Sequence, residues 1–217
     1  MPQQLRMHIS ISLDGFVAGP NQSEEDPLGE GGMRLHEWAV GLEAWRREHG
    51  HEGGDVNAST AVVERAVENV GAVIMGRNMF GGGPGEWGDW NGWWGDDPPF
   101  HAPVYVLTHH AREPLEMQGG TTFHFVTDGI EAALARAREA AGGRDVSLAG
   151  GASVAQQYLR AGLLDELQLN VVPVLLGDGE RLFDGVAGAD IALEQTEVIE
   201  APGVTHLTYS VKRASAS

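Results

Sequence analysis

Cysteine is absent from the 217-residue chain, and basic residues are scarce. Without cysteine there are no disulfides, no thiolate metal sites and no cysteine nucleophile. Lysine and arginine together number 14 against 31 aspartates and glutamates, which gives a formal net charge of −17. We therefore expect neither nucleic acid nor an anionic membrane as a partner, because both require a basic face. A small phosphorylated ligand is not excluded. Charges are screened beyond about 8 Å, so an arginine close to the ligand matters more for its binding than the net charge of the chain.

Long apolar runs are also missing. No stretch of about 18 apolar residues occurs, so no membrane-spanning segment is predicted. The first residues, MPQQLRMHISISLDG, have no apolar region behind a basic start, so no signal peptide is predicted. With 42% hydrophobic residues the chain can bury an ordinary core. We expect a soluble, cytoplasmic protein that acts on a small molecule.

Strand and helix patterns alternate through the middle of the chain, and the end has strands only. Apolar, β-branched runs bounded by glycine or proline predict strands, at 8–18, 72–76, 104–108, 122–127, 145–151, 164–176, 190–199 and 204–212. Three- and four-residue periodicity predicts helices, at 33–48, 58–71, 128–143 and 152–162. We predict one α/β domain over residues 1–217, with a largely parallel central sheet, flanking helices and a C-terminal antiparallel hairpin.

Two of these helices carry capping signals, and two polar loops separate the elements. Asp128 with Glu131, and Ser153 with Gln156, have the spacing of a capping box. The loops at 19–32 and 81–103 are rich in glycine and polar residues, and we expect them to form rims around a site.

Chemistry-bearing residues follow three of the predicted strands. Gly76, Arg77, Asn78 and Met79 follow one, Thr108 and His109 follow another, and Gly150-Gly151 follow a third. Ligands bind beyond the carboxyl ends of parallel strands, and arginine grips phosphate with a planar fork of donors. Glycines with positive φ allow close backbone approach, and the helix behind them offers free N–H groups. These strand ends predict a bed for a diphosphate-containing cofactor, although an ordinary βα turn explains the glycines equally well.

Other readings of the same segments stay open. The sequence around Ser153 nearly matches the G-x-S-x-G motif of serine hydrolases. Asp165 and His206 follow it in the chain order that this fold uses. The final glycine of that motif is replaced by Ala155, which weakens the match. A protein that binds a nucleotide without turnover is a third possibility.

A metal site is not expected. His49, His51, Glu52 and Asp55 are ligand types close together in the sequence, but they fall in a glycine-rich loop without a register to fix their geometry.

Four tryptophans stand in the loop 81–103, at positions 87, 90, 93 and 94. Their large apolar surfaces must be covered. They either cover the sheet or form an aromatic wall for a flat substrate.

Several segments resemble a known family. The segments are SISLDGFVA, VIMGRNMF, VYVLT, LAGGASVAQQYLRAGLLDEL and PVLLGDGERLF. Their order is similar to that of the dihydrofolate reductase-like family, in the branch of the reductase domain of bacterial riboflavin biosynthesis and its stand-alone relatives. The resemblance spans roughly residues 6–212. It implies the three-layer fold of that family and an NADPH-dependent oxidoreductase that forms a homodimer. In the riboflavin branch the activity is 5-amino-6-(5-phosphoribosylamino)uracil reductase.

The resemblance also implies roles for individual residues. Arg77 and Asn78, flanked by Gly76 and Met79, would meet cofactor phosphates, and Leu107, Thr108 and His109 would lie at the 2′-phosphate end. Gly150, Gly151, Ala152, Ser153 and Val154 would wrap the diphosphate, and Val17 and Ala18 would lie by the nicotinamide. Asp14 is a candidate proton donor or substrate contact, although an aspartate before glycine is at least as typical of a turn. Folate reductases have an acidic residue near the place where this chain has Thr60. The zinc deaminase domain common in riboflavin enzymes requires cysteines, which this chain lacks. The substrate therefore stays open.

Overall fold

The computed structural model describes residues 2–83 and 85–213. Its strands are β1 (Leu5–Ser12), β2 (Phe16–Ala18), β3 (Val70–Gly76), β4 (Pro103–Leu107), β5 (Leu115–Glu116), β6 (Thr122–Val126), β7 (Asp145–Gly150), β8 (Glu166–Val172), β9 (Glu180–Arg181), β10 (Ile191–Ala201) and β11 (Val204–Arg213). Its helices are η1 (Gly32–Leu35), α1 (Glu37–Val40), α2 (Glu43–Glu48), α3 (Ala58–Val67), α4 (Arg77–Phe80), η2 (Gln118–Gly120), α5 (Ile130–Ala141) and α6 (Ala152–Arg160).

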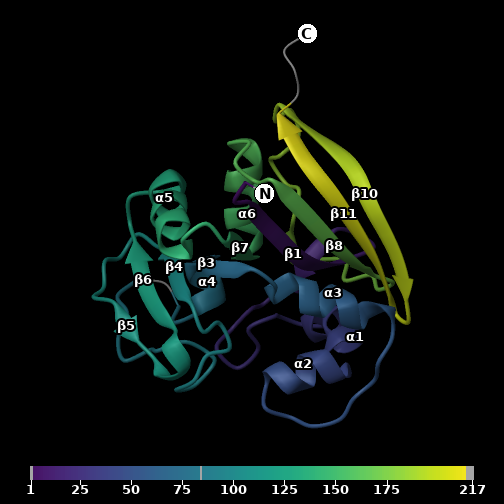
Figure 1. Cartoon of the computed structure of the whole chain (residues 1–217), viewed down its shortest axis with the longest axis horizontal. Coiled ribbons are helices and arrows are strands. Elements are labelled where there is room, and N and C mark those ends of the chain that lie inside the picture. The colour runs from purple at the N-terminus through teal and green to yellow at the C-terminus, as the bar shows by residue number, and fades with distance from the viewer. Residues whose placement is uncertain (1, 84, 214–217) are drawn as a thin grey trace.

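A nine-stranded sheet runs through the molecule in the order β10-β11-β8-β1-β7-β3-β4-β6-β5 (Figure 1). The six strands from β8 to β6 are mutually parallel. Strands β11 and β10 continue the sheet in antiparallel fashion at one side, and β5 pairs antiparallel at the other. The predicted parallel sheet with a C-terminal antiparallel hairpin is confirmed.

Helices cover both faces of the sheet. Helices α5 and α6 lie on one face, and α1, α2 and α3 lie on the other (Figure 1). Strand β3 explains why both faces need cover: Ile74 packs into the core under α5 and α6, while Val73 and Met75 pack with Phe80 of α4 on the opposite side. An unbroken apolar run is therefore what a central parallel strand requires.

Two predicted helices differ from the structure in length. The segment 33–48 is split into η1, α1 and α2. Helix α1 ends at Val40, and Leu42 takes an extended conformation before α2 begins. The helix predicted at 58–71 ends at Val67, and Gly71 belongs to β3 instead. A Cβ on Gly71 would lie 2.6 Å from the Ala141 carbonyl oxygen of α5, so packing rather than helix termination requires this glycine.

Both predicted capping boxes are wrong. Helix α5 is capped by Gly129 without a side-chain hydrogen bond, and Asp128 instead pairs with Arg136 at 2.6 Å. Helix α6 begins after Gly151, again without a side-chain cap. A capping box does occur on α3, where Asn57 and Thr60 bond reciprocally. Thr60 is thus occupied in holding the start of this helix.

The apolar run at 164–176 has no free edge. It forms β8, which ends before Pro173 and pairs with β1 on one side and β11 on the other. This strand therefore offers no edge through which a second copy of the chain could pair. No helix in the described part of the chain combines the length and apolar character that crossing a membrane requires.

Candidate functional site

A cavity of about 640 Å³ opens at the carboxyl ends of the parallel strands. Residues that follow β1, β3, β4, β6 and β7 contribute to its wall, together with parts of the loops 19–32 and 81–103. The wall includes every residue predicted to contact a cofactor, namely Val17, Ala18, Gly76, Arg77, Asn78, Met79, Leu107, Thr108, His109, Gly150, Gly151, Ala152, Ser153 and Val154. The topology thus brings together residues that are up to 137 positions apart in the sequence, from Val17 to Val154.

Gly76 is required by packing. A Cβ at this position would lie 2.7 Å from Cγ2 of Val154, which real contacts do not allow. The end of β3 therefore approaches the first turn of α6 closely, which brings the Arg77 segment and the diglycine segment to the same cavity.

Gly150 and Gly151 play different parts. Gly150 has φ +134°, a conformation reserved for glycine, whereas Gly151 has φ −87° and ψ −162°, which other residues adopt easily. The expectation of positive φ is therefore wrong for Gly151. A Cβ on Gly151 would meet nothing within 4 Å, although the residue lines the cavity. Its lack of a side chain leaves space in the cavity, and nothing in the surrounding protein requires it.

The N-terminus of α6 points donors at this part of the cavity. The first hydrogen bond of the helix runs from the Ala155 amide to the Gly151 carbonyl at 3.1 Å. The amides of Ala152, Ser153 and Val154 precede it, so they have no partner within the helix. Free amides and the positive end of the helix dipole together suit an anion.

Arg77 presents unsatisfied donors. Its Nε donates to the Gly83 carbonyl at 3.0 Å, and its guanidinium lies over the Trp87 ring at 3.8 Å from the centroid. Both terminal nitrogens, Nη1 and Nη2, are buried without a hydrogen-bond partner in the described structure. Burial lowers the pKa of this guanidinium, yet arginine keeps its charge in proteins. Buried donors of this kind require a partner, and a phosphate oxygen is a suitable one.

The turn after β4 is held by its own hydrogen bonds. The Thr108 hydroxyl accepts from the His110 amide at 3.1 Å, and the His110 carbonyl accepts from Nε1 of Trp87 at 2.9 Å. The position of His109 in the cavity wall is thereby fixed from both sides. Arg112, a third basic residue near this turn, is not in the wall, because its guanidinium donates to the Trp90 carbonyl and to Asn91.

The four tryptophans divide into two pairs. Trp87 is 7% exposed and packs in the core beside β3, β4 and β6, and Trp90 donates its Nε1 to the Phe80 carbonyl. Trp93 and Trp94 line the cavity. Trp94 packs against Phe123 of β6, so this aromatic wall lies towards β4 and β6.

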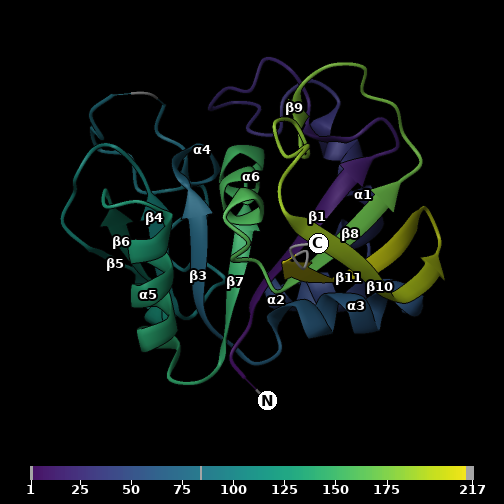
Figure 2. The same ribbon diagram turned by 90° about the horizontal axis from the view of Figure 1, so that it is seen from above.

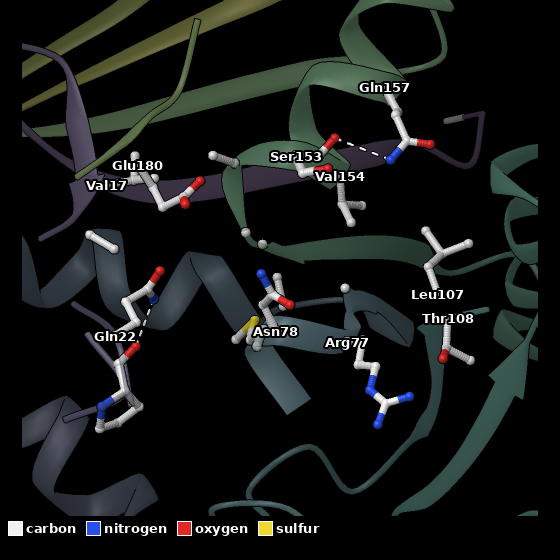
Figure 3. A pocket seen from close by; sticks show the side chains of 18 of the residues that line it. Val17, Gln22, Arg77, Asn78, Leu107, Thr108, Ser153, Val154, Gln157 and Glu180 are labelled. Atoms are coloured by element: carbon white, nitrogen blue, oxygen red, sulfur yellow. Dashed lines mark hydrogen bonds between the residues drawn. The ribbon is translucent and has the colours of Figure 1, made fainter. Parts of the chain in front are cut away.

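The opposite end of the cavity contains residues that the sequence patterns did not reveal. Gln22, Pro27, Leu28, His36 and Glu180 line it beside Val17 and Ala18. Figure 3 shows Val17, Gln22 and Glu180 at one side of the pocket and Arg77, Leu107 and Thr108 at the other. His36 is half-buried, and burial lowers the pKa of its imidazole. The loop 19–32 was predicted to be a rim, but a single histidine within an expected helix gave no signal.

Asp14 lies outside the cavity wall and stabilises a turn. Its carboxylate accepts from the Ser12 hydroxyl and from the amides of Leu176 and Gly177, the last at 2.7 Å. The Ser12 hydrogen bond is the main reason that the pKa of Asp14 falls to about 2. A carboxylate with this pKa holds no proton at neutral pH, so we do not assign it the role of proton donor. It ties the β1–β2 turn to the segment after β8.

The hydrolase constellation is not assembled. Ser153 lines the cavity, whereas His206 is buried under α3, where its ring bonds Ser59 at 2.8 Å and Asn170 at 2.7 Å. Asp165 accepts from the Leu5 amide at 2.7 Å. The three residues serve three separate structural purposes, and the triad hypothesis is wrong.

The histidine-rich loop has a structural explanation as well. His49 stacks on Trp45 with ring centroids 3.7 Å apart and bonds its carbonyl. Across residues 2–83 and 85–213, no three histidine, aspartate or glutamate side chains gather as a metal ion would require.

Comparison with known proteins decides the family. Residues 3–207 match the RibD C-terminal domain. The chain belongs to the RibD C-terminal domain family. A 92-residue stretch of this RibD C-terminal domain protein is also 28% identical to the uncharacterised protein YyaP of Bacillus subtilis (strain 168), covering 41% of this chain and 48%, about half, of that relative.

Solved structures share its fold. A protein from Shewanella sp. PV-4 assigned to riboflavin biosynthesis has a TM-score of 0.65 at 21% identity, with 97% of this chain and all of that one covered. RibD of Acinetobacter baumannii has a TM-score of 0.58 at 16% identity, and the match covers 97% of this chain and 58% of that one. A pyrimidine reductase-like protein from Corynebacterium diphtheriae has a TM-score of 0.51 at 12% identity, with coverage of 98% and 92%. The predicted dihydrofolate reductase-like fold is confirmed.

Proposed function

We propose that this RibD C-terminal domain protein is an NADPH-dependent reductase that acts on a carbonyl or imine carbon of a small molecule. One observation carries the proposal: Arg77, whose terminal guanidinium nitrogens have no hydrogen-bond partner, lines the same cavity as the residues with free amides at the start of α6. Two anion-binding devices in one cavity suit a ligand with more than one phosphate.

The residues present fit the cofactor. Arg77 and His109 would hold phosphate oxygens beside β3 and β4, and the α6 amides would hold others next to Gly151, where no Cβ obstructs the approach. Asn78 lies between these groups in the pocket (Figure 3) and offers both a donor and an acceptor. When bound, NADPH supplies a hydride.

His36 would act at the substrate. It lines the cavity and follows η1, which contacts β2, the strand that contains Val17 and Ala18. Because burial lowers its pKa, the imidazole is neutral at pH 7 and carries one N–H donor and one acceptor nitrogen. The donor can bond the oxygen or nitrogen of the group being reduced and orient it.

The test separates binding from turnover. Tryptophan fluorescence is titrated with NADPH, and the saturated protein is then screened with carbonyl and imine compounds for substrate-dependent loss of NADPH absorbance. The proposal expects saturable binding followed by loss of absorbance with at least one compound. His36→Phe should lower turnover and leave NADPH affinity unchanged, whereas Trp38→Phe, a nearby change outside the cavity wall, should affect neither. Binding with no turnover across the screen would favour the alternative of a nucleotide-binding protein.

We also propose a homodimer, on the family resemblance alone. Strand β10 is the free antiparallel edge of the sheet and exposes Leu193 and Val198. Light scattering at micromolar concentration should give twice the chain mass, and the mass of one chain would contradict the dimer.

A further inference from the structure

The cavity has two chemically different ends. The sheet order places β1 and β4 on opposite sides of β7 and β3, so residues that follow β1 lie across the cavity from residues that follow β4 (Figure 2). We call the two sets the β1 end and the β4 end. The β1 end consists of Val17, Ala18, Gln22, Pro27, Leu28, His36 and Glu180, and the β4 end of Leu107, Thr108, His109, His110, Val126 and Thr127. If the cofactor phosphates occupy the diglycine segment, Arg77 and the β4 end, the substrate must enter at the β1 end.

The wall of the β1 end and the loop segment next to it carry acidic residues. Glu180 is part of its wall, and Glu24, Glu25 and Asp26 stand exposed in the loop between two wall residues, Gln22 and Pro27. His36 is the one basic side chain among the described residues of this end, and burial favours its neutral form. Lysine and arginine are absent from its described wall.

The nearest arginines along the chain are directed elsewhere. Arg181 follows Glu180 on β9, and because neighbouring strand residues alternate in direction, it turns away and stacks over the Phe16 ring at 4.4 Å. Arg34 is exposed and donates to the Leu175 carbonyl at 3.5 Å. Neither side chain is part of the cavity wall.

From this arrangement we infer that the substrate is an unphosphorylated molecule, neutral or cationic at the part that enters the β1 end. The inference rests on the proposed function and narrows it. A phosphate dianion brought to this end would exchange water for a carboxylate and a neutral imidazole, without the cation that phosphate recognition requires. The chain would therefore differ from the phosphoribosyl-type reductase that the family resemblance implies.

Matched ligand pairs test the inference. The pairs are 5-amino-6-(ribosylamino)uracil with its 5′-phosphate, and riboflavin with its 5′-phosphate. Each compound is titrated by calorimetry into protein saturated with NADPH, after NADPH binding has been measured separately. We expect the unphosphorylated member of at least one pair to bind on the order of ten-fold more tightly than its phosphate. Equal or tighter binding of the phosphates would overturn the inference, and so would a failure of both unphosphorylated compounds to bind.

A charge-reversed variant provides a second, independent readout. Glu180→Arg places a cation in the β1 end and should improve binding of the phosphorylated members roughly ten-fold, the value of one charge-assisted hydrogen bond. Glu200→Arg makes the same change of charge on the exposed edge strand β10 and should have no effect. Equal effects of the two variants would show that overall charge matters and that the β1 end does not select. Because NADPH affinity is measured beforehand, loss of the proposed function itself would be seen as absent NADPH binding.

Discussion

Replacement of Gly151 by valine should abolish tight cofactor binding without unfolding the protein. The backbone at this residue, with φ −87° and ψ −162°, accepts a β-branched side chain, and a Cβ would meet no protein atom within 4 Å. Glycine replacement at a compatible position changes the free energy of unfolding by less than about 1 kcal/mol. The variant should therefore fold as the parent does. Its side chain would occupy the space in front of the α6 amides.

The loss of affinity follows from the donors that become inaccessible. One hydrogen bond to a charged phosphate contributes about 1.5–3 kcal/mol, so the loss of one weakens binding roughly ten- to a hundred-fold. The matched control is Gly41→Val. Gly41 also has a compatible backbone, with φ −81°, and the nearest atom to its Cβ is a carboxylate oxygen of Asp55 at 4.0 Å. Neither Gly41 nor Asp55 is part of the cavity wall.

The assay compares NADPH titrations and thermal unfolding for the parent and both variants. The expected result is a normal melting temperature for both, with NADPH affinity lost only in Gly151→Val. A folded Gly151→Val protein with parental NADPH affinity would refute the reasoning that the start of α6 holds a phosphate.

Three further predictions concern charge and pH. Arg77→Gln should weaken NADPH roughly ten- to a hundred-fold by the loss of its guanidinium, and unchanged affinity in a titration would contradict its role. Burial lowers the folded-state pKa of His206 to about 4, so protonation of this imidazole favours the unfolded state. Its contribution to the free energy of unfolding is full above pH 6.5, and that free energy should fall by roughly 2–3 kcal/mol towards pH 4. Urea unfolding should show a smaller fall over this pH range in His206→Gln. The hydrogen bond from Ser12 lowers the pKa of Asp14 from 3.8 to about 2. The contribution of this carboxylate to stability therefore exists above pH 4 and is lost towards pH 2. The difference in stability between parent and Asp14→Asn should shrink over that range, and a constant difference would contradict the structural role of Asp14.

The central architecture was readable from the sequence because buried parallel strands leave continuous apolar runs. The run at 72–76 and the glycines at 150–151 mark strand ends that fold into one cavity, and residues that follow parallel strands meet at one edge of the sheet. This is why every expected cofactor contact lies in the cavity wall. Local side-chain contacts were harder to predict. Asp128 and Ser153 have the spacing of helix caps, yet Asp128 pairs with Arg136, and α6, the helix of Ser153, begins without a side-chain cap.

The β1 end was not readable, because it depends on contacts between distant segments. His36 enters the cavity only because the expected helix 33–48 breaks into three short pieces, and Glu180 enters because β9 pairs with β2. Asp14 was misjudged for the same reason, since the amides of Leu176 and Gly177 that bind its carboxylate are 162 and 163 residues away. No local pattern reports such long-range hydrogen bonds.

Calorimetric titration of the parent protein with NADPH and with NADH shows whether the cavity holds the cofactor. We predict a saturable site at which NADPH binds on the order of ten-fold more tightly than NADH, because Arg77 and His109 can bond the additional phosphate. Equal dissociation constants for the two cofactors, or no binding of either, would contradict it.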